Sequence, residues 1–311
     1  MAISKRRTAA AFFIRHSLFA MCFAALAGIC SAPAASQIQM AKIAARPALW
    51  TAHGRNSTVY LFGSIHLLPA NVVWHTPAID AALDSADTFM FEAPIDQAGQ
   101  AEVSEFVRKN GSLPKGTTLR SILPRDALAH YEQALTAAHL APDALDGERP
   151  WLAAIVLDVA YLQQMHYVVA DGVDLQVFAF ARARKKTVRY FETPEQQLTM
   201  FMPKDRKLEI AEFDTDLKQF QTEQNTIGAM VDAWGAGDVA TVGRLMNKTL
   251  ASVPGTKKLL IDDRNKAWVK ALDDTLASSG VTFVTVGTGH LAGPGGVPAL
   301  LRAKGYRVDG P

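Results

Sequence analysis

The chain has 311 residues, of which 49% are hydrophobic and 20% are charged. This composition excludes a disordered, collagen-like or low-complexity protein, and the length is enough for one large domain or two small ones with a buried core. Thirty-two basic residues stand against 30 acidic ones, so the overall charge gives no reason to expect a nucleic acid as a partner.

Residues 1–34 have the pattern of a signal peptide. Basic residues come first, then a 13-residue apolar run from 17 to 29, and then the small residues Ala32-Pro33-Ala34 at a cleavage site. Such a run is short for a bilayer-spanning helix, although an uncleaved anchor is the alternative. Removal of residues 1–34 takes away four basic residues and both cysteines, and changes the formal net charge from +2 to −2. We expect a periplasmic or secreted protein with no stable membrane insertion after cleavage.

The first predicted elements of the mature chain are short strands. Residues 35–47 have little apolar periodicity and are expected to form a flexible leader before a domain over residues 48–311. Strands at 49–52 and 58–62 flank a turn and predict a hairpin. A helix at 77–85, with Thr76 as its N-cap, and a strand at 88–91 follow.

The rest of the chain alternates between long helical stretches and single strands. The spacing of apolar residues predicts helices over 97–180, a strand at 187–191, helices over 194–279, a strand at 281–286, a helix ending near 304 and an edge strand at 306–308. This order predicts an α/β fold: a central mixed, mostly parallel sheet flanked by helices, with a large helical insertion.

Four predicted strands lead into polar residues. His66 and His290 each stand three residues after a glycine in a G-x-x-H loop, and Glu92 and Glu192 follow the other two strands. Ligands of open α/β sheets bind at the carboxyl ends of the strands, so these side chains are candidates for one site. Histidines and carboxylates there suit a divalent transition metal or a hydrolytic base.

Each of these residues also has a structural interpretation. The histidines could simply bond to loop carbonyl groups. Glu92 and Glu192 could each cap a following helix, which for Glu192 would begin at Thr193. Arg264, at the start of an amphipathic helix, could stabilise an oxyanion or form a salt bridge. The other histidines of the mature chain have no partner spacing and are expected to be structural or on the surface.

Together these motifs resemble those of the TraB/GumN family, which is related to the Tiki metalloproteases. The matching pieces span residues 49 to 308 in family order and are Val59–His66, Phe89–Glu92, Gly172–Asp174, Phe191–Thr193 with Gln197, Arg264–Asn265, and Val286–Leu291 with Gly293 and Gly296. The resemblance implies a fold similar to the erythromycin esterase and ChaN groups. It also implies an active site built from His66, Glu92 and His290, with Glu192 and Arg264 in support.

The expected function is therefore that of an exported, metal-dependent hydrolase with a peptide or small-molecule substrate. His66, Glu92 and His290 would hold manganese, cobalt or zinc, of which the resemblance implies the first two. Whichever of Glu92 and Glu192 is not a ligand would act as general base, and Arg264 would steady the oxyanion. The alternative is a non-catalytic protein of ChaN-like fold that binds haem or another ligand.

Overall fold

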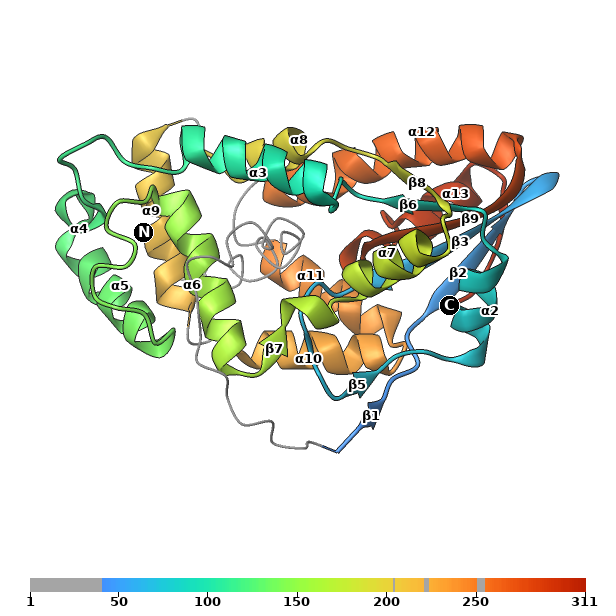
Figure 1. Ribbon diagram of the computed structural model, residues 1–311, viewed down its shortest axis with the longest axis horizontal. Helices are drawn as coiled ribbons and strands as arrows, with labels where there is room; N and C mark the ends of the chain where they lie inside the picture. The colour runs from blue at the N-terminus through green and yellow to red at the C-terminus, as the bar shows by residue number, and fades with distance from the viewer. Residues whose placement is uncertain (1–40, 204, 221–223, 251–254) are drawn as a thin grey trace, which may run out of the picture.

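The computed structural model describes residues 41–203, 205–220, 224–250 and 255–311 (Figure 1). The predicted signal peptide and both cysteines lie outside these residues. Within the described ranges, no helix has the length and apolar character needed to cross a membrane.

A six-stranded sheet forms the centre of the molecule. Its order is β10-β2-β3-β9-β6-β8, in which β3, β9, β6 and β8 run parallel while β2 and β10 are antiparallel to their neighbours. The strands are β2 (Leu49–His53), β3 (Asn56–Ser64), β6 (Thr88–Phe91), β8 (Thr187–Tyr190), β9 (Ser279–Gly287) and β10 (Arg307–Asp309). The predicted α/β class with a mixed, mostly parallel sheet is confirmed. The predicted hairpin is β2 and β3, whose turn is closed by the Gly54 N–H donating to the Ser57 carbonyl oxygen at 3.0 Å.

Both faces of the sheet are buried, because successive side chains of a strand point to opposite sides. On β6, Phe89 and Phe91 belong to one hydrophobic cluster, while Met90 between them belongs to the other. The Met90 face is covered by α12 (Asp263–Ala277) and α13 (Val297–Ala303). The opposite face packs against α2 (Pro77–Ser85) and α7 (Val173–Ala183) (Figure 1).

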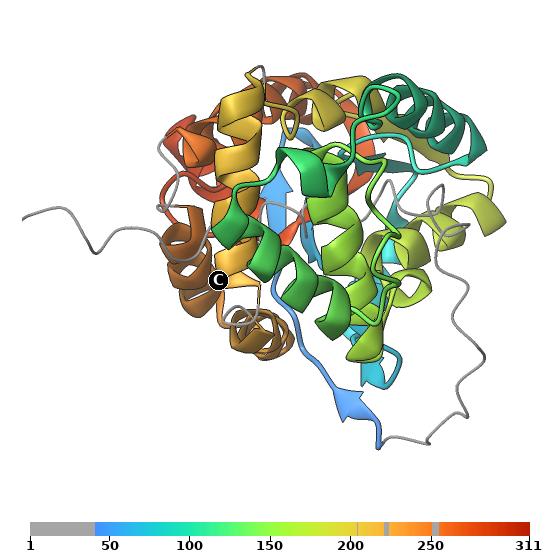
Figure 2. The same ribbon diagram turned by 90° about the vertical axis from the view of Figure 1, so that its left-hand side faces the viewer.

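The predicted helical insertion forms a separate part of the same body, at the left of Figure 1 and facing the viewer in Figure 2. The remaining α-helices are α3 (Gln97–Asn110), α4 (Leu119–Ile122), α5 (Arg125–Ala137), α6 (Pro150–Gln164), α8 (Pro194–Thr199), α9 (Arg206–Gln219), α10 (Gln224–Gly235) and α11 (Val239–Leu250). Three short helical segments are also described: η2 (Val169–Asp171) before α7, the π-helical η3 (Lys258–Asp262) before α12, and η4 (Thr288–His290) after β9.

Several two-residue strands were not predicted. They are β1 (Ile43–Ala44), β4 (Leu68–Pro69), β5 (Val72–Val73) and β7 (Tyr167–Val168), which pair as β1 with β5 and β4 with β7. Part of the predicted leader contacts the domain, because β1 pairs with β5 and Ala45 is 5% exposed. The Ala45 N–H also donates to the Val73 carbonyl oxygen at 2.7 Å, which fixes this segment to the domain.

Candidate functional site

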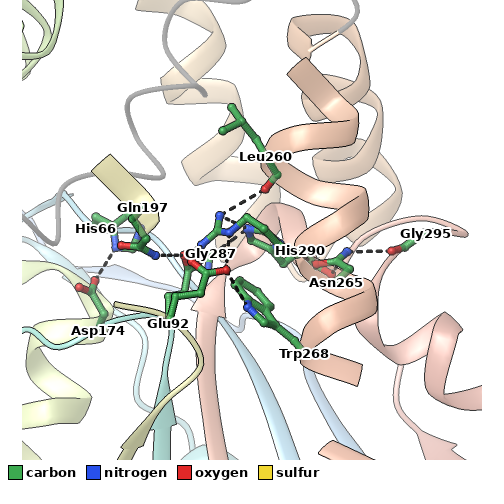
Figure 3. A network of polar contacts seen from close by, with 12 residues as sticks. His66, Glu92, Asp174, Gln197, Leu260, Asn265, Trp268, Gly287, His290 and Gly295 are labelled. Atoms are coloured by element: carbon green, nitrogen blue, oxygen red, sulfur yellow. Dashed lines mark hydrogen bonds and ion pairs between the residues drawn. The ribbon is translucent and has the colours of Figure 1, made fainter. Parts of the chain in front are cut away.

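The carboxyl ends of the parallel strands bring the candidate residues to one edge of the sheet (Figure 3). His66 follows β3, Glu92 follows β6, Glu192 follows β8 and His290 closes η4 after β9. The Glu192 N–H donates to the Glu92 carbonyl oxygen at 2.8 Å. The two acidic residues therefore lie side by side, just after the neighbouring strands β6 and β8. Helix α12 adds Arg264 from its first turn. The structure therefore brings these five residues close together.

Glu92 is an ionised carboxylate at the centre of the group. It is 1% exposed; Oε1 accepts the Gly287 N–H at 2.7 Å, and Oε2 accepts from Arg264 at 2.5 Å and from the Gln197 amide at 3.1 Å. Burial raises the pKa of Glu92, but the positive charge of Arg264 outweighs it, with smaller contributions from His290, His66 and the Gly287 N–H, and the pKa is lowered to about 2. A carboxylate with so low a pKa is a poor proton acceptor at neutral pH.

Arg264 joins the elements of the site through all five of its N–H groups. The acceptors are Oε1 and Oε2 of Glu192 at 2.8 and 2.9 Å, Oε2 of Glu92 at 2.5 Å, the Leu260 carbonyl oxygen at 3.2 Å and Nε2 of His290 at 3.0 Å. Burial would lower the pKa of Arg264, but the two carboxylates raise it. Of the two roles considered for Arg264, an oxyanion contact or a salt bridge, the structure shows the salt bridge, with Glu92 and Glu192. To hold an oxyanion, Arg264 would first have to release one of these acceptors.

Glu192 serves the same arrangement and does not cap a helix. Besides Arg264, it accepts the indole N–H of Trp268 at 2.9 Å, and the guanidinium carbon of Arg264 lies 4.6 Å from the centre of the Trp268 ring. Helix α8 is capped by Thr193, whose side chain accepts the Gln196 N–H at 3.2 Å. The predicted helix start at Thr193 is therefore right, and the capping interpretation of Glu192 is wrong.

The partners of His290 fix its protonation. Arginine can only donate, so Nε2 of His290 accepts from Arg264. The Asn265 amide donates to two carbonyl oxygens, His290 at 3.2 Å and Gly295 at 2.8 Å, so its oxygen accepts the Nδ1 hydrogen of His290 at 2.6 Å. Burial and the charge of Arg264 lower the pKa of His290 to about 3. His290 is thus a neutral imidazole with both ring nitrogens engaged.

His66 has one ring nitrogen engaged and one available. Its Nδ1 hydrogen bonds to Oδ1 of Asp174 at 2.9 Å, and both residues are at most 3% exposed. Burial lowers the pKa of His66, but the charge and hydrogen bond of Asp174 and the charge of Glu92 outweigh it and raise the pKa above 6.5. Nε2 is buried and has no hydrogen-bond partner among the described residues.

The loop of His66 and the start of α7 are built against each other. The Val173 N–H donates to the Ile65 carbonyl oxygen at 3.0 Å. A Cβ on Gly172 would lie 2.2 Å from the carbonyl oxygen of His66, so only glycine lets the two backbones approach this closely. Asp174 follows two residues later and is thereby brought to the imidazole.

The donor set does not fit the predicted metal ion in this arrangement. Nε2 of His290 lies 4.0 Å from Oε1 of Glu92, and Arg264 already bonds to both residues. In the part of the chain that the structure describes, no group of three or more His, Cys, Asp or Glu side chains is placed to hold a metal ion. Of the three predicted ligands, only His66 has a ring nitrogen with no partner in the described structure. Metal binding by His66, Glu92 and His290 stays a prediction.

Two other described histidines form ion pairs away from the site. His53 pairs with Asp309 at 2.8 Å, and His75 pairs with Asp80 at 2.6 Å, with all four side chains at least one third exposed. The role of Asp174 was missed by the sequence analysis. Its signal was present, because Gly172–Asp174 is one of the motifs that carried the resemblance, but no spacing connects it with His66.

The protein thus has an α/β fold, in which polar residues follow the strands of a mixed sheet and a group of helices forms an insertion. The chain belongs to the TraB/PrgY/gumN family, whose sequence model matches residues 48–310. It is similar to "Uncharacterized protein YbaP" of Escherichia coli (strain K12), with 24% identity over 251 residues that cover 79% of this chain and 89% of that protein. It is also similar to an "Uncharacterized protein" of Treponema pallidum (strain Nichols), with 21% identity over 276 residues, 82% of this chain and 80% of that protein. The resemblance found in the motifs is confirmed.

Proposed function

We propose that this protein is a hydrolase in which His66 is the general base and Asp174 orients it. One observation carries the proposal: Nε2 of His66 is buried and has no partner among the described residues, His66 is one of the residues that line a pocket, and its Nδ1 is held by Asp174. A histidine held by a carboxylate at one nitrogen presents the lone pair of the other nitrogen to a water molecule.

The chemistry follows from this orientation. Water attacks the carbonyl carbon of the substrate while its proton passes to Nε2 of His66, and the imidazolium then gives that proton to the leaving group. Asp174 stabilises the imidazolium, and the negative charge of Glu92 does so as well, since both raise the pKa of His66. Glu192 and Arg264 hold Glu92 and His290 in place and are positioning residues in this proposal.

The proposal includes export to the periplasm or the medium and a peptide or small-molecule substrate. Activity should be measured on the mature protein with a panel of activated esters and short peptides. His66→Ala should lower kcat/KM by at least a hundredfold, and Asp174→Asn should lower it by at least tenfold. His53→Ala is the matched control, because that imidazole pairs with Asp309 on the surface.

The pH profile separates a base from a structural histidine. The base must be deprotonated, so kcat/KM should fall as the pH drops through the raised pKa of His66, above 6.5. Asp174→Asn removes the charge that raises this pKa, and the acidic limb should move to lower pH. An acidic limb that stays in place in Asp174→Asn, or full activity of His66→Ala, would contradict the proposal.

The alternative function, haem binding without catalysis, is supported by the same atom, Nε2 of His66, which has no partner among the described residues. A neutral imidazole whose second nitrogen bonds to a carboxylate is an axial ligand that haem iron takes. Haem titration of the purified protein distinguishes the two functions: an absorbance band near that of histidine-ligated haem, lost in His66→Ala, would establish binding without turnover.

A further inference from the structure

One described pocket beside the site has about 610 Å³ of empty space, a figure that includes open solvent at its mouth. His66 and Ser64, at the end of β3, form part of its wall together with Gly287 at the end of β9. The remaining wall is mostly apolar and includes Leu162 from α6, Tyr167 from β7, Ile227 and Met230 from α10, and Met246 from α11. The pocket thus lies between the sheet edge and three helices that the catalytic proposal does not use.

Its polar groups are concentrated at one end. Oγ of Ser64 and Nε2 of His66 are both buried without a partner among the described side chains, and both residues line the pocket. Ligand sites typically combine a mostly apolar lining with a few polar groups that orient the ligand. A molecule that fills this pocket would place its polar group at His66 and its apolar part against α10 and α11.

We infer that the substrate carries an aliphatic acyl group, which enters this pocket and places its carbonyl carbon beside His66. The inference rests on the proposed hydrolase function and specifies its substrate class. Burying each methylene group contributes about 0.8 kcal/mol to binding, equivalent to about fourfold in affinity. The pocket should therefore bind longer acyl groups more tightly than acetyl. Met230 and Met246 are flexible and polarizable, so the lining adapts to chains of different shape.

Binding is measured apart from turnover with linear amides that are not hydrolysed during the titration. Hexanamide should bind about fifteenfold more tightly than butanamide by calorimetry, because it buries two more methylene groups. Acetyl, butyryl and hexanoyl esters of p-nitrophenol are then compared as substrates, and kcat/KM should rise in the same order.

Ile227→Trp fills the pocket from α10, where the isoleucine is half-buried. It should lower the affinity for hexanamide at least tenfold and raise KM for the hexanoyl ester. Leu208→Trp is the matched control, since Leu208 is 51% exposed on α9 and is not among the residues that line the pocket. Ile227→Ala, a milder change, keeps the test usable if the larger side chain prevents folding, and should weaken hexanamide only severalfold.

The outcomes separate the two proposals. Hexanamide binding that Ile227→Trp abolishes, without hydrolysis of any ester or peptide of the panel, supports the pocket and refutes the hydrolase. Equal affinity for butanamide and hexanamide, or hexanamide binding unchanged in Ile227→Trp, refutes the acyl pocket even when the esters are hydrolysed.

Discussion

At neutral pH the site holds an ionised Glu92 and a neutral His290, and both states are lost in acid. The pKa of His290 is about 3 in the folded protein, against an ordinary 6.5, so the unfolded chain binds more protons between these values. Stability should fall by up to about 1.4 kcal/mol for each pH unit below about 6.5. Glu92 adds a loss of the same sign from about pH 4.5 toward about 2.

Urea denaturation between pH 7.5 and 4 measures this acid sensitivity. His66 acts in the opposite direction, because its raised pKa contributes stability below about 6.5 that is lost as the pH rises through the folded value. In His290→Gln the slope below pH 6.5 should become flatter, whatever the variant does to stability at neutral pH. A slope as steep as that of the parent would show that another group is responsible.

Replacing Glu92 by glutamine tests the charge at the centre of the site. Glu92 faces the buried Arg264, and breaking a buried ion pair typically costs about 3–5 kcal/mol, so Glu92→Gln should lower the free energy of unfolding by roughly that amount at pH 7. Glu105→Gln is the control, since that carboxylate pairs with Arg108 on the surface and should change stability little. A neutral or stabilising effect of Glu92→Gln would mean that repulsion between carboxylates governs the site.

The variant Arg264→Met tests whether the guanidinium occupies the position of a metal ion between Glu92 and His290. Removing a buried cation that faces two carboxylates typically costs about 3–5 kcal/mol. Mn²⁺, Co²⁺ or Zn²⁺ should then raise the Tm of Arg264→Met but not of the parent or of the surface control Arg120→Met. A metal that raises the Tm of the parent, with stoichiometric retention after dialysis, would establish the metal-dependent hydrolase instead.

At the scale of elements, Gly172 joins the His66 loop to α7. Gly172→Ala places a methyl group 2.2 Å from the His66 carbonyl oxygen, so the backbone has to move and Asp174 moves with it. We expect a cost of about 1–3 kcal/mol in stability and a larger proportional loss of activity. Gly147→Ala is the control, because a Cβ there meets nothing within 4 Å. Unchanged activity in Gly172→Ala would show that the contact is not needed.

Elements with strong local signals could be predicted, and those defined by distant partners could not. The alternation of Thr58–Phe62 and the cap at Thr76 are local, and both appear as expected. The two-residue strand β7 exists only because it pairs with β4, about 100 positions earlier in the chain, which no local pattern shows. The same holds within the site. Glu92 could be predicted because it directly follows a strand, whereas the hydrogen bond between Asp174 and His66 depends on how α7 packs against the His66 loop.

At the scale of the whole molecule, export is the prediction that concerns the chain before the described residues. The basic start, the 13-residue apolar run and Ala32-Pro33-Ala34 predict cleavage after Ala34. Mass spectrometry of protein recovered from the native host should find a mature chain that begins near Ala35. An intact chain beginning at Met1 in the membrane fraction would show an uncleaved anchor.

The hydrogen bonds of the Arg264 guanidinium affect which parts of the protein can unfold locally. Its acceptors come from residues 92, 192 and 290 and from residue 260 in the preceding helical turn, so three other stretches of chain meet at this side chain. Opening the stretch of residue 92 or of residue 192 leaves the buried guanidinium without one of its two carboxylates, which makes separate local unfolding of these stretches unfavourable. The Gly287 N–H, held by Glu92, should therefore exchange with deuterium only through global unfolding, and should exchange much faster in Arg264→Met.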